Sequence, residues 1–230
     1  MASVNIGGAV SVGVAAGIGL IGLFILLFVI IVVANRAEPD PRGLRPLSVY
    51  LFSMTFVMLQ LAYAGTVLII TSLFSFIGPH SSPLTNGVAR SVVIGALLLL
   101  IAGTTMAFHL RKGVDIAEGD GRVDGPNARI LRTYSSVVTF IYLFTMVVAL
   151  GVSIYFLFEL IGPGVFGGGG HGRSAIVRNL LDTLYVMVAS GIIVFAHSQL
   201  SGPSIFPFGR LGTRTPEGAE TVVVIVEEEL

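Results

Sequence analysis

Apolar residues dominate this chain in five long runs, and polar residues gather in the short segments between them. Runs of about 20 apolar residues are long enough to cross the hydrocarbon core of a bilayer, which is roughly 30 Å thick. The sequence therefore predicts an all-α integral membrane protein with five transmembrane helices. These helices are predicted over 8–34, 47–77, 88–109, 130–161 and 176–200.

The segment 47–79 occurs a second time, without a gap, as 131–163. The match is clearest where LFSFIGP (73–79) aligns with LFELIGP (157–163). The second half of each copy also matches once four residues are allowed for the GGGG run. Corresponding pairs in the two copies are Arg45 and Arg129, Tyr50 and Tyr134, Thr55 and Thr139, Phe56 and Phe140, Arg90 and Arg178, Gly103 and Gly191, and His109 and His197.

The repeat predicts the domain organisation of the chain. A leading transmembrane helix (1–35) precedes a first two-helix repeat (43–112) and a second one (128–200), and a tail covers 201–230. Because each repeat crosses the membrane twice, both copies enter it in the same direction. We expect parallel repeats, related by a pseudo-two-fold axis along the membrane normal.

Composition agrees with a membrane protein and excludes several classes of function. Hydrophobic residues make up 54% of the chain and charged residues 11%, and the mean hydropathy is +0.92. The 13 basic and 13 acidic residues balance, so no net field favours nucleic acid. The chain has no cysteine, which excludes disulfides, thiolate metal sites and cysteine nucleophiles.

The distribution of basic residues predicts the orientation in the membrane. Ten of the 13 lie at one side if the N-terminus is outside, and Arg90, Arg173 and Arg178 lie at the other. Basic residues favour the cytoplasmic side. We therefore expect a multi-pass protein of the cell (inner or plasma) membrane, with its N-terminus outside and its C-terminus in the cytoplasm.

Small and polar residues within the helices are candidates for helix packing. Ala9, Gly13 and Gly17 recur every four residues and form one ridge on which another helix can pack closely. Gln60, near the middle of its helix, is expected to hydrogen-bond a neighbouring helix, and the alternative is that it lines a substrate path. Glu159 and Asp182 are expected near the outer helix ends, where water reaches them.

The tail ends in TVVVIVEEEL and differs in kind from the helices. Its β-branched run favours a strand over 221–227 that pairs with an edge in this chain or in a partner. The alternative is an unstructured tail that the three final glutamates keep soluble. The candidate partner-binding residues are Val222, Val223, Val224, Ile225 and Val226.

His109 and His197 are the candidate cofactor ligands, because they hold equivalent positions in the two repeats. Two imidazoles facing each other across an axis can ligate a haem iron, and one alone can ligate a chlorophyll-type magnesium. The alternative is that duplication copied a histidine suited to the membrane boundary. No acidic residue is placed to orient either ring, so we predict no cofactor and no metal site.

The double unit resembles a group of uncharacterised bacterial membrane proteins built from a two-helix domain of unknown function. Each unit of that group opens with a basic residue and a tyrosine and closes near a histidine. Here those residues are Arg45, Tyr50 and His109 in the first unit, and Arg129, Tyr134 and His197 in the second. The resemblance covers about 43–200 and implies no activity.

No catalytic motif is present in the sequence, and we expect a protein that is not an enzyme. The first hypothesis is an accessory or assembly subunit of a larger membrane complex, whose partners are the lipid bilayer and other membrane protein subunits. The second is a small solute transporter or channel with a path near Gln60. The third is a bis-histidine haem or pigment-binding redox protein.

Overall fold

The computed structural model describes residues 40, 42–77, 86–119, 125–162 and 172–200, together with Gly22, Ile25 and Val29, and all regular secondary structure in these residues is helical. Each of the four helices in these ranges is long and apolar enough to cross a membrane. They are α2 (Arg45–Phe74), α3 (Asn86–Gly119), α4 (Pro126–Ile161) and α5 (Arg173–Ser198). The all-helical character predicted from the sequence is confirmed for these ranges, and the four helices are compatible with a multi-pass membrane protein.

Two predicted elements fall largely outside the described residues. The leading helix over 8–34 is described only at Gly22, Ile25 and Val29, which are helical, so its ridge of Ala9, Gly13 and Gly17 is untested. The strand over 221–227, with Val222 to Val226, also lies outside the described residues. Both stay predictions.

Proline and glycine set the beginnings of α2 and α4. Each helix has a proline in its first turn, where no intrahelical partner is needed for the missing N–H. Before α2, Gly43 takes a φ of +62°, which favours glycine, and the backbone N–H of Arg45 donates to the Asp40 carboxylate at 3.0 Å. Before α4, Gly125 is extended.

Helix α3 is longer than the sequence indicated, because it continues ten residues past His109 to Gly119. The end predicted for the helix over 88–109 is therefore wrong by ten residues. These last turns are amphipathic: Gly113 and Ala117 are buried, whereas Asp115 and Glu118 are exposed. A Cβ on Gly113 would lie 2.9 Å from the Phe52 ring, so this extension packs directly on α2.

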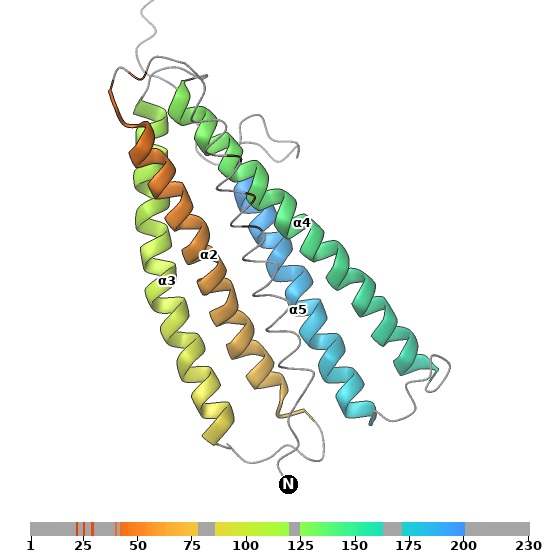
Figure 1. Ribbon diagram of the computed structural model, residues 1–230. Helices are drawn as coiled ribbons and strands as arrows, with labels where there is room; N and C mark the ends of the chain where they lie inside the picture. Colours follow the sequence, from red (N-terminus) through yellow and green to blue (C-terminus); the bar gives the residue numbers. More distant parts are fainter. Residues whose placement is uncertain are drawn as a thin grey trace, which may run out of the picture.

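The helices form two antiparallel hairpins, α2 with α3 and α4 with α5, each pair lying side by side (Figure 1). Helices α2 and α4 both begin at the end of the molecule where α3 and α5 finish (Figure 1). The two hairpins therefore run in the same direction, as the parallel repeat requires. The exact domain limits, 43–112 and 128–200, stay predictions.

The two helices pack against each other by different means in the two hairpins. In the first, the backbones of α2 and α3 touch, because a Cβ on Gly65 would lie 2.7 Å from the Gly95 carbonyl oxygen. In the second, a hydrogen bond of 2.9 Å from the Ser153 hydroxyl to the Thr183 hydroxyl joins α4 to α5. Thr183 is the sequence counterpart of Gly95. Small residues and interhelical hydrogen bonds are the two usual means of packing helices in lipid.

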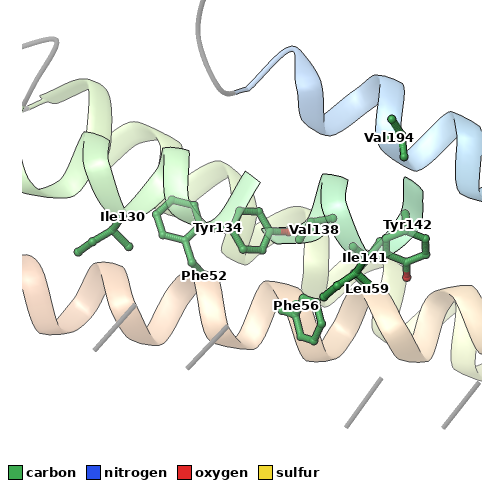
Figure 2. Packing of buried hydrophobic residues seen from close by; sticks show 9 residues of the cluster. All are labelled: Phe52, Phe56, Leu59, Ile130, Tyr134, Val138, Ile141, Tyr142 and Val194. Carbon is green, nitrogen blue, oxygen red and sulfur yellow. The ribbon is translucent and has the colours of Figure 1, made fainter. Parts of the chain in front are cut away.

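The core of the described helices is an apolar seam between α2 and α4, which α5 covers at one point (Figure 2). It consists of Phe52, Phe56 and Leu59 from α2, Ile130, Tyr134, Val138, Ile141 and Tyr142 from α4, and Val194 from α5. The rings of Phe52 and Tyr134 stack with centroids 5.2 Å apart. Gly22 also reaches this seam, since a Cβ there would lie 2.7 Å from Ile141 and 3.2 Å from Phe56. The leading segment thus contacts both hairpins at Gly22.

The seam corrects the expected pseudo-two-fold symmetry. A two-fold axis brings the same face of α2 and α4 together, and each contact then has a partner contact between the corresponding residues. Because Phe52 contacts Tyr134, two-fold symmetry would require Tyr50 to contact Ser136 in the same way. Tyr50 and Ser136 are both exposed. Tyr134 corresponds in the repeat to Tyr50, which lies two residues before Phe52. Two positions that are two residues apart in an α-helix are separated by about 160° around the helix axis, measured the shorter way round. The two helices therefore meet through nearly opposite faces.

We predict that Gly65→Ala and Gly95→Ala each lower the stability of the purified protein by about 1–3 kcal/mol, because the added Cβ meets backbone that cannot yield. Thermal unfolding in detergent measures the effect. The matched control is Gly151→Ala, whose Cβ would meet nothing within 4 Å and which should leave the unfolding temperature unchanged or slightly raised. Equal loss in all three variants would contradict the close approach of α2 and α3.

Candidate functional site

One buried polar pair of the described chain consists of Tyr134 on α4 and His197 on α5. The Tyr134 hydroxyl and the Nε2 atom of His197 are 3.1 Å apart. Nδ1 of the same ring is 3.0 Å from the Ile193 carbonyl oxygen, to which it donates, so in the neutral ring Nε2 accepts from the tyrosine. Ser135 adds a third link by donating to the His197 carbonyl. His197 is 6% exposed and Tyr134 is fully buried.

The first hairpin holds the counterpart of this pair, Tyr50 and His109, in an open form. Their rings meet edge to face with centroids 5.9 Å apart. Nδ1 of His109 is 2.8 Å from the Thr105 carbonyl oxygen, so both histidines bond the carbonyl one turn before them. Tyr50 is 53% exposed, and within the described residues nothing hydrogen-bonds Nε2 of His109. The tyrosine and the histidine thus form a buried hydrogen bond in the second hairpin, whereas in the first hairpin only their rings meet.

This difference bears on the hypothesis of a bis-histidine site. A histidine that ligates iron or magnesium uses one ring nitrogen for the metal and donates from the other to a carbonyl or a carboxylate. His109 has that arrangement. His197 does not, because Tyr134 occupies the nitrogen that a metal would need. Ligation by both histidines would require the Tyr134 hydrogen bond to break.

A second group of polar side chains lies where the middle parts of α2, α4 and α5 meet. The Tyr63 hydroxyl lies 3.2 Å from the Ser190 hydroxyl, and the Tyr63 and Tyr142 rings meet edge to face at 5.3 Å. Gln60 approaches the Tyr142 hydroxyl. Within the described residues, neither the Gln60 Nε2 nor the Tyr142 hydroxyl has a hydrogen bond of normal geometry. Gln60 therefore faces a neighbouring helix but leaves two buried polar groups unsatisfied.

Buried polar side chains also join the hairpins near the end where α2 and α4 begin. The Ser48 hydroxyl donates to Oδ1 of Asn127 at 2.7 Å, and both side chains are fully buried. This bond and the Tyr63–Ser190 contact link different hairpins. Polar groups thus hold the two hairpins together at two depths.

The two acidic residues within the later spans differ from their expected setting. Glu159 is only 4% exposed, so the prediction that water reaches it is wrong. Asp182 is half-buried, and its Oδ1 has no hydrogen-bond partner among the described residues. Arg178 lies one turn before it. In the described ranges, no group of three or more histidine, aspartate and glutamate side chains is placed to hold a metal ion.

The sequence singled out both histidines and both tyrosines, but their contact was not predicted. The signal was present, because Tyr50 and Tyr134 correspond in the repeat just as His109 and His197 do. Two residue types duplicated together, one near the start of the first helix and one near the end of the second, indicate a contact across an antiparallel hairpin.

Comparison of the chain with models of protein families, with curated proteins and with solved structures found no match.

We predict that Tyr134→Phe destabilises the protein by about 1 kcal/mol, because Nε2 of His197 loses its buried donor. The matched control is Tyr50→Phe, which removes an exposed hydroxyl and should change stability by less than about 0.5 kcal/mol. Thermal unfolding in one detergent measures both variants. A loss that is equal in the two variants would contradict the distinction between the closed and the open pair.

Proposed function

We propose that this chain is a non-enzymatic, multi-pass membrane protein that serves as an accessory or assembly subunit of a larger membrane complex. The observation that carries the proposal is the use of its polar side chains. Ser48 with Asn127, Tyr134 with His197, and Ser153 with Thr183 form hydrogen bonds from helix to helix. These groups are engaged in holding the helices together.

The outer surface of the described helices supports the same proposal. Large apolar side chains are exposed along every span, and they include Leu100 and Ile101 on α3, Phe140 and Phe144 on α4, and Ile192 on α5. Such a surface suits lipid tails and the apolar helices of other membrane proteins. The predicted tail strand over 221–227 offers a further contact to a partner.

The charge at the two ends of the helices supports the proposed orientation. Arg45, Arg111 and Arg129 lie at the end where α2 and α4 begin, whereas Arg90 and Arg173 lie at the other. The end richer in basic residues faces the cytoplasm under the positive-inside rule. This supports a cell-membrane protein with its N-terminus outside and its C-terminus inside.

A small solute transporter or channel is the alternative that one observation favours. The Gln60 Nε2 and the Tyr142 hydroxyl are buried near the middle of the spans, where α2, α4 and α5 meet, and neither has a hydrogen-bond partner among the described residues. Unsatisfied polar groups at that depth are costly and suit a polar solute or an ion that passes through. The bis-histidine redox protein is less well supported, because Nε2 of His197 is engaged.

We predict that the tagged protein, extracted from its own cells in mild detergent, carries at least one other membrane protein in a fixed ratio, as measured by quantitative mass spectrometry. Truncation before residue 221 should reduce that ratio if the tail pairs with the partner. The matched control replaces Glu227, Glu228 and Glu229 with glutamine. It removes charge, keeps the β-branched run, and should retain the partner.

A protein that purifies alone contradicts the proposal. If liposomes that contain it then pass a solute or an ion, and Gln60→Leu abolishes the flux, the transporter alternative replaces the accessory role.

A further inference from the structure

The α2–α4 seam buries one face of each helix. The repeat identifies the residues of α4 that correspond to the seam face of α2. On α2 the seam face carries Phe52, Phe56, Leu59 and Tyr63. The residues of α4 that correspond to them in the repeat are Ser136, Phe140, Leu143 and Val147. We call these four the open α4 face. Phe140 is 68% exposed, Leu143 43% and Val147 56%, and Ser136 is exposed as well.

The same correspondence identifies an open face on α2. The seam face of α4 carries Tyr134, Val138, Ile141 and Tyr142. The residues of α2 that correspond to them are Tyr50, Met54, Val57 and Met58, which we call the open α2 face. Tyr50 is exposed and the other three are half-buried. Each chain thus presents, on opposite sides, the counterparts of the two surfaces that already pack together inside it.

We propose that a second copy of this chain docks its open α2 face on the open α4 face of the first, and so repeats the internal seam between chains. The pairing places Tyr50 of one copy on Ser136 of the next, as Tyr134 packs on Phe52 within the chain. It places Met58 on Val147, as Tyr142 packs on Tyr63. The new interface continues an established one.

The contact is head to tail, because two different faces meet. An interface of this kind leaves one open face at each end of a pair, so it adds copies until a ring closes or an array grows in the membrane plane. A two-fold dimer, in contrast, joins the same face of both copies and stops at two. The inference concerns copies of this chain alone and goes beyond the proposed accessory role, so either can fail while the other stands.

The absence of cysteine in the chain makes the test direct. Tyr50→Cys, Ser136→Cys and the double variant of the full chain are treated in membranes with a short bismaleimide, and the products are separated in denaturing gel. We predict that the double variant gives a ladder of dimers and higher species, whereas each single variant stays monomeric. The pair Met58→Cys and Val147→Cys should give the same ladder.

Two controls keep the result specific. Leu100→Cys with Ile192→Cys places thiols at positions that are 65% and 63% exposed and lie outside both open faces, and it should give no ladder. Phe140→Ala in the Tyr50/Ser136 double variant removes a large exposed ring from the interface and should abolish the ladder.

Three outcomes would overturn the proposal. A double variant that stays monomeric means that lipid covers these faces. Dimers from either single variant mean that like faces meet. A ladder from the Leu100/Ile192 control that equals the others means random collision in the membrane.

Discussion

The structure depends on one constraint: inside a bilayer, a polar group has to find its hydrogen-bond partner within the protein, because hydrocarbon offers none. The two hairpins meet that constraint at two points where they join. Ser48 bonds Asn127 near one end of the helices, and Tyr63 bonds Ser190 deeper in the spans. The apolar seam between these two bonds positions α2 against α4. The bonds add direction to packing that the apolar side chains alone leave nonspecific.

The two hairpins share one tyrosine–histidine arrangement but use it differently. Both histidines donate to the carbonyl of the residue one turn before them, and both meet the tyrosine of their own hairpin. In the second hairpin the tyrosine lies in the seam and bonds the histidine, whereas in the first it faces outward. This asymmetry arises because α2 and α4 meet through different faces. The seam within the chain buries one face of α4 and leaves the corresponding face of α2 open.

The sequence predicted the spans well and the contacts poorly, for physical reasons. Long apolar runs indicate segments that are stable in lipid, so the four described helices were found, and the ends of α2, α4 and α5 were predicted to within four residues. The predicted helix over 88–109 was too short because the last turns of α3 are charged on one side. These turns pack on α2 through the contact of Gly113 with Phe52, a residue far away in the sequence. The symmetry was wrong because a repeat specifies equivalent residues but not which faces meet. The contact of Tyr134 with His197 was not predicted, because the two residues lie 63 positions apart in the sequence.

Helices α2 and α4 meet through different faces, and this contact can be tested within a single chain. The most direct measurement is thiol cross-linking within single chains of the variant Ser48→Cys with Asn127→Cys, read by mass spectrometry of the linked peptides. We predict an intramolecular link in this variant, because the two side chains are hydrogen-bonded at 2.7 Å. We predict no intramolecular link for Gly43→Cys with Arg132→Cys, the counterparts that a two-fold axis would bring together. An intramolecular link in the second pair, or its absence in the first, would contradict the account.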